Sequence, residues 1–154
     1  MNEVKKIASF EVNHNLLTEG IYVSRIDVDI TTYDLRTRVP NAGDYMDNLT
    51  MHSLEHMLAT YIRSSEIADS VIYFGPMGCQ TGFYLLVRNA DNSRVLEVLK
   101  DTLLRIISHS GEIFGKSAIE CGNYRNLDLV AAKREAQRYL DVLASRNHDF
   151  KYKA

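Results

Sequence analysis

Residues 50–67 restrict the fold more than any other segment, because their polar and apolar side chains are separated at helical spacing. At about 100° per residue, His52, Glu55 and His56 fall on one face of a helix. Ala59 and Arg63 continue the same stripe. The opposite face is apolar and carries Met51, Leu54, Leu58, Tyr61 and Ile62. Such a helix buries its apolar face and leaves the histidine face available for chemistry.

The spacing of His52 and His56 indicates a metal site. Two imidazoles one helical turn apart can bind one ion, and Glu55 lies beside them. The alternative is a solvated polar face on an amphipathic helix. H-x-x-E-H is also the motif of inverzincin proteases, in which the glutamate activates a metal-bound water. The motif alone does not separate a protease from another metalloenzyme.

A catalytic metal usually has three protein ligands, so a further ligand must come from outside this helix. Cys121 is a candidate, because it precedes a glycine and lies outside the predicted strands, just before the last predicted helix. The competitors are the acidic residues and His14, His109 and His148. The residue chemistry leaves this choice open.

The other cysteine, Cys79, lies in a turn that also contains Gly75, Pro76, Gly78 and Gly82. This composition indicates a specified backbone path between two strands. A thiol at such a turn can face a pocket, where a metal or a cation would activate it. The alternative is a small buried residue at a strand end. Two cysteines are too few for a disulfide framework, and a bond between them does not fit a reducing compartment.

Strand patterns flank this turn. Residues 71–74 and 82–88 are predicted strands that the turn joins. Earlier in the chain, residues 21–39 are rich in β-branched side chains. There the alternation of polar residues with Ile26, Val28 and Ile30 predicts a strand with one buried face.

Helices are predicted at 92–108, with Asn92 or Ser93 as the N-cap, and at about 127–146. The chain has no βαβ rhythm, no G-x-G-x-x-G and no P-loop, which disfavours nucleotide-binding α/β folds. We therefore predict an α+β fold with an antiparallel sheet packed with helices.

The composition limits the number of domains and the partners. A length of 154 residues predicts a single domain over residues 1–154. Eighteen Lys and Arg against 20 Asp and Glu give a net charge of −2, which makes no case for nucleic acid or an anionic membrane as a partner. No apolar run approaches the length of a membrane span, and residues 1–12 lack the features of a secretory signal. We expect a cytoplasmic protein.

Several motifs together resemble one family. They are SFEVNH (9–14), YDLR followed by VPN (33–36, 39–41), HSLEHMLATYIR (52–63), GPMGCQTGFY (75–84), ECG (120–122) and AAK (131–133). In order and spacing, the chain resembles the S-ribosylhomocysteine lyase (LuxS) family along nearly its whole length. The resemblance implies a homodimer with two sites at the subunit interface. It also implies cleavage of S-ribosylhomocysteine to homocysteine and 4,5-dihydroxy-2,3-pentanedione, the precursor of autoinducer-2.

The resemblance also implies roles for the residues of the histidine helix and for both cysteines. His52, His56 and Cys121 would bind the metal, which is usually Fe²⁺ in this family, with Zn²⁺ or Co²⁺ as possible occupants, one per subunit. Glu55 and Cys79 would be the general acid and base.

Four more residues would bind substrate. Ser9 and His14 would contact the ribose, and Arg36 would lie close to both the ribose and Cys79, favouring the thiolate. Arg63 would help to hold the homocysteine end. In a homodimer, Ser9, His14 and Arg36 could come from the other chain.

The sequence departs from the family pattern at a few positions. Tyr73 stands where most members have an Asp that faces the amine of the substrate, in a local sequence close to IDISPMGC. Phe74-Gly75 replaces the usual Ile-Ser, and Thr37-Arg38 replaces the usual Phe-Cys. We expect the chemistry to survive these changes, with weaker or indirect binding of the amine. A non-catalytic relative that keeps the fold is a further alternative.

Overall fold

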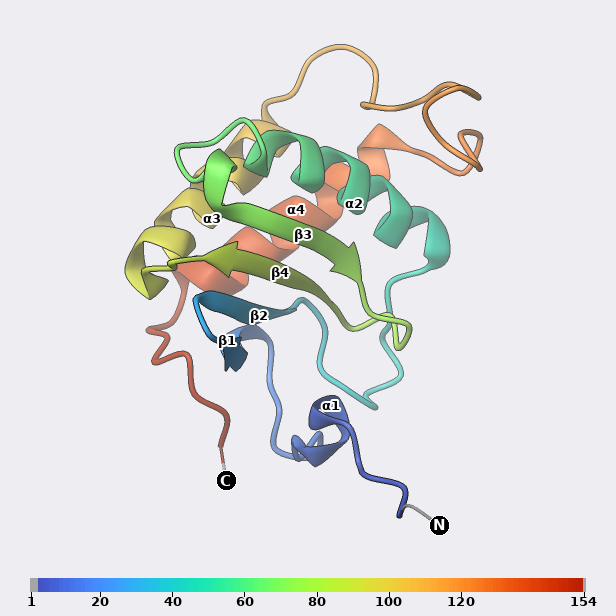
Figure 1. Cartoon of the computed structure of the whole chain (residues 1–154). Coiled ribbons are helices and arrows are strands. Elements are labelled where there is room, and N and C mark those ends of the chain that lie inside the picture. Colours follow the sequence, from blue (N-terminus) through green and yellow to red (C-terminus); the bar gives the residue numbers. More distant parts are fainter. Residues whose placement is uncertain (1–2, 154) are drawn as a thin grey trace.

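The computed structural model describes residues 3–153, in which segments rich in β-branched and aromatic residues form a four-stranded antiparallel sheet (Figure 1). The strands are β1 (Gly20–Asp27), β2 (Ile30–Arg36), β3 (Val71–Pro76) and β4 (Gly82–Arg88), in the spatial order β1-β2-β4-β3. The predicted strands at 71–74 and 82–88 are confirmed, as is the antiparallel sheet.

The predicted single strand over residues 21–39 is wrong, because a two-residue turn divides it into β1 and β2. Asp27 pairs with Ile30, and Val28 at the tip has φ 58°, a conformation that β-branched residues rarely adopt. Ile26 is 64% exposed and Val28 99% exposed. The alternation at 26–30 therefore does not mark a buried face, since these residues form the solvated tip of a hairpin.

The helices α2 (Asn48–Ile62), α3 (Asn92–Ile107) and α4 (Leu129–Ala144) cover one face of the sheet (Figure 1). Their N-caps are Asp47, Asp91 and Asp128, whose carboxylates accept hydrogen bonds from backbone N–H groups of the first turn. The cap of α3 is thus one residue before the predicted Asn92. The helix α2 ends at Ile62, five residues before the predicted end, and the short 3₁₀ helix η1 (Ala68–Ser70) follows.

Alternation along the central strands sends Tyr33, Leu35 and Leu85 into the core against the helices. From α2, the predicted apolar face is buried at Met51, Leu54, Leu58 and Ile62, and Tyr61 is partly buried. The described residues therefore form one α+β unit around a continuous core.

The opposite face of the sheet carries the other alternating residues, which include Ser24, Thr32 and Tyr84. The short N-terminal helix α1 (Ala8–Glu11) contacts β1. Within residues 3–153, none of the helices combines the length and the hydropathy needed to cross a bilayer.

Candidate active site

His52, His56 and Cys121 come together beside the first half of α2. One potential ligand atom from each residue lies within 4.8 Å of the others, and the three side chains are partly buried. The two imidazole rings are 4.7 Å apart at their centroids and perpendicular. Cys121, from the long connection between α3 and α4, places its Sγ 3.5 Å from His52 Nε2. Local helical spacing therefore brings the two histidines together, and the fold adds the cysteine.

Backbone carbonyl groups fix the orientation of both imidazoles. Nδ1 of His52 lies 2.8 Å from the carbonyl oxygen of Asn126, and Nδ1 of His56 lies 2.8 Å from that of Phe114. A carbonyl oxygen can only accept, so each Nδ1 carries the proton and each Nε2 keeps its lone pair. Two imidazole nitrogens and a thiolate suit Fe²⁺, Zn²⁺ or Co²⁺ and leave a fourth position for substrate, so the residues present fit a catalytic divalent metal.

Glu55 precedes His56 on the same helix, and its side chain is partly buried. It is therefore on the element that presents both histidines. Arg63 is the C-cap of α2 and is exposed to solvent. The structure does not bring Arg63 into the cavity that contains Cys79.

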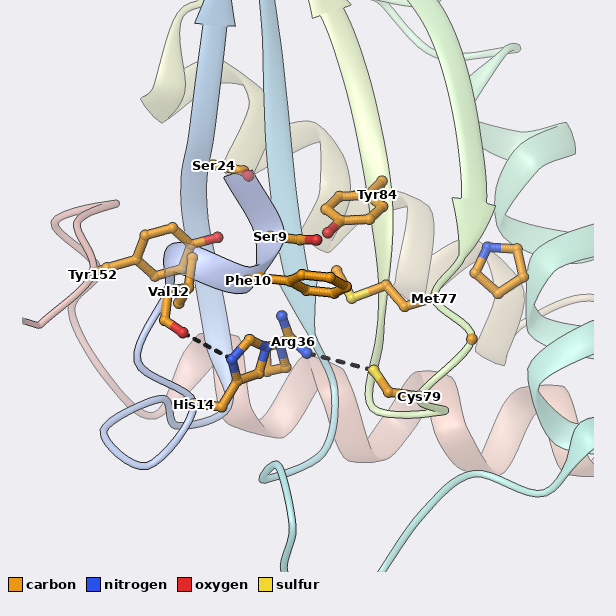
Figure 2. A pocket seen from close by; sticks show the side chains of 12 residues that line it. Ser9, Phe10, Val12, His14, Ser24, Arg36, Met77, Cys79, Tyr84 and Tyr152 are labelled. Atoms are coloured by element: carbon orange, nitrogen blue, oxygen red, sulfur yellow. Dashed lines mark hydrogen bonds between the residues drawn. The ribbon is translucent and has the colours of Figure 1, made fainter. Parts of the chain in front are cut away.

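Four of the predicted site residues line one cavity of about 360 Å³: Ser9, His14, Arg36 and Cys79 (Figure 2). The N-terminal segment supplies the serine and the histidine, β2 ends at the arginine, and the turn after β3 supplies the cysteine. His14 is oriented by its own segment, because its Nδ1 lies 2.9 Å from the carbonyl oxygen of Val12. His52, His56, Glu55 and Cys121 do not line this cavity.

Arg36 is buried, and its guanidinium makes a bidentate contact with Asp34. Its Nε and Nη2 donate to the two carboxylate oxygens of Asp34 at 3.0 and 2.6 Å. Its Nη1 donates to Thr81 Oγ1 at 2.8 Å and lies 3.9 Å from Cys79 Sγ. Burial opposes the charged form, but the charge and hydrogen bonds of Asp34 outweigh it and raise the pKa of Arg36 above its ordinary value. The cavity thus contains a permanent cation beside the thiol.

Both cysteines are free thiols; Cys79 is exposed and Cys121 is partly buried. The alternative of a small buried core residue is therefore wrong for Cys79, and its thiol is 3.0 Å from Thr81 Oγ1. The turn is tight: Gln80 has φ 64°, and a Cβ on Gly82 would lie 2.5 Å from the carbonyl oxygen of Leu35. Only glycine allows this close approach of β4 to β2 at that point.

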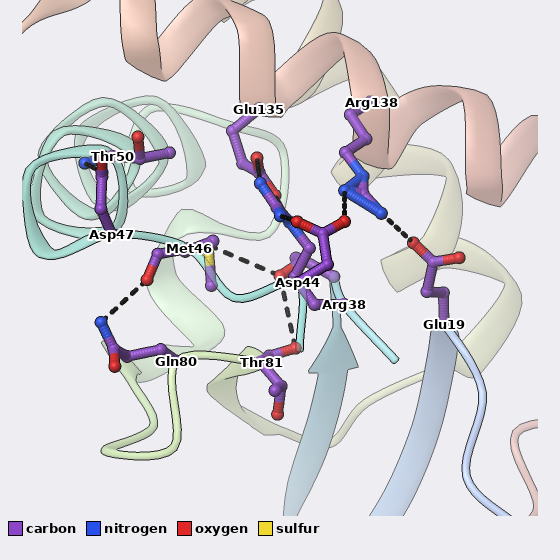
Figure 3. Close-up of polar contacts among 11 residues, drawn as sticks. Glu19, Arg38, Asp44, Met46, Asp47, Thr50, Gln80, Thr81, Glu135 and Arg138 are labelled. Atoms are coloured by element: carbon purple, nitrogen blue, oxygen red, sulfur yellow. Dashed lines mark hydrogen bonds and ion pairs between the residues drawn. The ribbon is translucent and has the colours of Figure 1, made fainter. Parts of the chain in front are cut away.

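A second loop holds the cysteine turn in place (Figure 3). The side chain of Gln80 donates to the carbonyl oxygen of Met46 at 2.8 Å, and the backbone N–H of Met46 donates to the carbonyl of Gln80 at 3.1 Å. That loop is fixed to α4 by Arg38, which donates to both carboxylate oxygens of the buried Glu135 at 3.0 and 2.6 Å. Arg38, one of the departures from the family pattern, therefore helps to hold the loop that contacts the cysteine turn.

Several residues that line the cavity, or that contact Arg36 and Cys79 within it, were not predicted from the sequence. Asp34 and Thr81 lie inside the motifs YDLR and GPMGCQTGFY, which could have suggested them. Tyr152 had no signal: it reaches the cavity from the C-terminal segment, and its hydroxyl donates to Asp34 Oδ2 at 2.7 Å. Tyr84 also lines the cavity, and burial raises its pKa.

Tyr73, the departure at the expected amine site, is half exposed on the edge strand β3. It lines a shallow groove beside the Cys79 cavity, and the two share Ser9, Ser24 and Tyr84 as lining residues. The phenol ring extends over Gly75, so that a Cβ at that position would overlap the hydroxyl.

Fold and site together define an α+β protein with a cluster of two histidines and a cysteine that could hold a metal ion, and a separate cavity with a thiol beside an arginine. The family described as S-Ribosylhomocysteinase (LuxS) matches residues 7–150, and the chain belongs to that family. It is 42% identical over 154 residues to the S-ribosylhomocysteine lyase of Desulfotalea psychrophila, covering 94% of this chain and 97% of that protein. It is 43% identical over 145 residues to the S-ribosylhomocysteine lyase of Finegoldia magna, covering 91% and 92%.

Proposed function

We propose that the protein is a metal-dependent lyase that cleaves S-ribosylhomocysteine to homocysteine and 4,5-dihydroxy-2,3-pentanedione. The observation that carries this proposal is the presence, in a chain of this family, of both parts that the reaction needs. One part is the cluster of His52, His56 and Cys121, and the other is the cavity in which Arg36 lies beside Cys79. The relatives that match most of the chain are named for this activity.

The chemistry requires proton transfer at successive carbons. The substrate has a thioether on C5 of an aldose. In each shift, a proton leaves the carbon next to the carbonyl and is delivered to the former carbonyl carbon. Two such shifts move the carbonyl from C1 to C2 and then to C3. The proton on C4 then becomes acidic, and its removal expels the homocysteine sulfur from C5 by β-elimination. We assign the proton transfers to Glu55 and Cys79.

Each remaining residue has a role in this scheme. Arg36 favours the thiolate of Cys79 and binds ribose oxygens, while Ser9 and His14 orient the sugar from the N-terminal segment. Arg63 is proposed to hold the homocysteine end, although it lies at the exposed C-cap of α2.

His52, His56 and Cys121 would hold one divalent metal per subunit, and we propose Fe²⁺, with Zn²⁺ or Co²⁺ able to replace it. When bound, such an ion supplies Lewis acidity that polarises the carbonyl and acidifies the neighbouring C–H group.

We also propose a homodimer in which each active site combines residues of two chains. In support, the cavity with Cys79 and the metal cluster share no lining residue. Three exposed apolar side chains lie on or beside the sheet face that the long helices leave uncovered: Ile7 and Tyr73 line the shallow groove, and Phe10 lines the Cys79 cavity. We propose that a second copy covers this face and that its metal cluster lies next to the first copy's cavity.

Complementation between two inactive variants tests the shared site. Cys79→Ala and Cys121→Ala chains are co-expressed with different tags and purified as the mixed dimer. If each site combines two chains, the mixed dimer contains one site without either substitution, and thiol release returns. An inactive mixed dimer would place the whole site within one chain.

The cytoplasm is the proposed compartment, because a catalytic thiol and a thiolate ligand both need reducing conditions. We propose that residues 1–154 act as one domain, without nucleic acid or membrane as a partner. Cell fractionation checks the compartment, and a reagent that labels free thiols should modify the protein in the cytoplasmic fraction.

Loss of thiol release separates the lyase from a protease. Metal-loaded protein, purified without air, should release a thiol from S-ribosylhomocysteine, and both Cys79→Ala and Glu55→Gln should abolish that release. A metalloprotease would instead cleave peptides, lose activity in Glu55→Gln and keep it in Cys79→Ala. A non-catalytic relative would bind a substrate analogue, or nothing, without turnover.

A further inference from the structure

The acceptor that orients His56 lies in a segment without regular secondary structure. Phe114 follows α3 by several residues, and its carbonyl oxygen lies 2.8 Å from His56 Nδ1. The segment also passes directly against the ring: Gly115 has φ 72°, and a Cβ there would lie 2.8 Å from His56 Nδ1. A small displacement of this segment would therefore move the acceptor or the imidazole. Contacts with neighbouring residues must therefore hold residues 112–115 in place relative to α2.

The nearly buried His109 provides one anchor. Its Nε2 lies 2.8 Å from the carbonyl oxygen of Glu112, which can only accept, so Nε2 carries the proton. Its Nδ1 lies 2.7 Å from the hydroxyl of Tyr61, which can donate to it or accept from it. The imidazole thus links α2 to the segment through two hydrogen bonds.

Aromatic packing provides the second anchor. The ring of Phe114 meets Tyr61 edge to face with centroids 5.1 Å apart, and it meets His109 in the same way at 4.7 Å. The guanidinium of Arg105 on α3 lies over the ring of Tyr61, 4.5 Å from its centroid. Tyr61 lies five residues after His56 on α2, so one helix carries both the ligand and the contact that holds the ligand's acceptor.

We propose that Tyr61 and His109 are positioning residues of the metal centre. They hold Phe114 where its carbonyl keeps the proton of His56 on Nδ1 and reserves Nε2 for the metal. This inference rests on the metal site of the proposed function. It assigns roles to two residues that are not themselves metal ligands. His109, a competitor for the third ligand position in the sequence, thereby acts on the metal through another histidine.

The test uses full-length protein loaded with Co²⁺, whose ligand-field absorption reports the geometry of the site. The variants are Tyr61→Phe, which keeps the ring and removes the hydroxyl, His109→Ala, and His109→Gln, which keeps one donor and one acceptor. Tyr139→Phe is the matched control, because the hydroxyl of this buried tyrosine also makes a hydrogen bond, in its case to the backbone carbonyl oxygen of Gly20 at 2.8 Å. Its hydroxyl lies between α4 and β1, on other elements than the metal ligands.

In Tyr61→Phe and His109→Ala, the cobalt absorption should change, and a chelator should remove Co²⁺ roughly three to ten times faster than from the wild type. His109→Gln should recover part of the difference, and Tyr139→Phe should match the wild type. If Tyr61→Phe loses cobalt no faster than Tyr139→Phe and keeps the wild-type spectrum, the positioning role is wrong. If the wild type binds no cobalt, the metal site itself fails, which is a distinct result. Should His109→Ala fail to fold, Tyr61→Phe decides alone.

Discussion

Tyr73 and Gly75 are coupled on the edge strand β3, because the phenol ring of Tyr73 occupies the space that a side chain at residue 75 would need. The family pattern has a short acidic residue and a serine at these two positions. In this chain a large residue at one position is accommodated by the absence of a side chain at the other. The two departures are therefore one structural change.

A double-mutant cycle measures this coupling. In a Tyr73→Ala background, Gly75→Ala should stabilise the protein by about 0.5 kcal/mol, because alanine restricts the unfolded chain more than glycine does. In the wild type that gain should disappear, since the half-exposed ring must move away. Urea unfolding of the four proteins gives the coupling free energy. An equal effect of Gly75→Ala in both backgrounds would show that the residues are independent.

The ion pair between Arg38 and Glu135 should contribute strongly to stability. Their side chains are 12% and 3% exposed, so Glu135→Ala leaves a largely desolvated guanidinium whose remaining ion pair, among residues 3–153, is with the exposed Asp44. We expect a loss of about 3 kcal/mol in the free energy of unfolding. The exposed pair Arg25–Asp27 provides the control, and Asp27→Ala should change little. Similar losses in both variants would contradict the prediction that the buried pair contributes more to stability than the exposed one.

Buried tyrosines predict a loss of stability at alkaline pH. Burial, followed by the charge of Asp34, raises the pKa values of Tyr139 and Tyr152 above the ordinary 10.0. The unfolded chain therefore releases these protons first, so their contribution is complete below about pH 10 and falls as the pH rises further. The urea midpoint should decrease more steeply between pH 9 and 11 in the wild type than in Tyr139→Phe. Parallel pH curves would contradict this prediction.

Metal binding should raise the melting temperature through the two histidines and Cys121. A ligand that binds only the folded state, at about 100 times its dissociation constant, stabilises it by about 2.7 kcal/mol. Zn²⁺ should therefore raise the melting temperature of the wild type and of Cys79→Ala, whose altered residue lies in the separate cavity. Cys121→Ala should lose most of the shift. The reverse pattern would assign the metal to the other cysteine.

The sequence was informative where the signal is local. The periodicity of α2 predicted both its buried face and the meeting of His52 with His56, because residues four apart share a helix face. The meeting of Cys121 with them was implied by the family resemblance, since the residue chemistry left several competitors. The roles of Glu55, Cys79 and the substrate-binding residues stay predictions.

Other features had no local signal. The carbonyl groups of Asn126 and Phe114 that orient the imidazoles belong to the backbone, so no residue type marks them. Tyr152 meets Asp34 across 118 positions of sequence. At the hairpin tip, the alternation of polar and apolar residues continues through the turn at Val28. Whether these apolar side chains are buried depends on how far the hairpin extends beyond the helices.

Thiol release from S-ribosylhomocysteine tests the central claim most directly. The wild-type protein is purified and loaded with Fe²⁺ without air, and homocysteine and 4,5-dihydroxy-2,3-pentanedione are both quantified. We expect catalytic release of the two products in equal amounts, and none from Cys79→Ala loaded with the same amount of iron. If folded, iron-loaded wild type releases no thiol, or if Cys79→Ala releases it at the wild-type rate, the proposed mechanism is wrong.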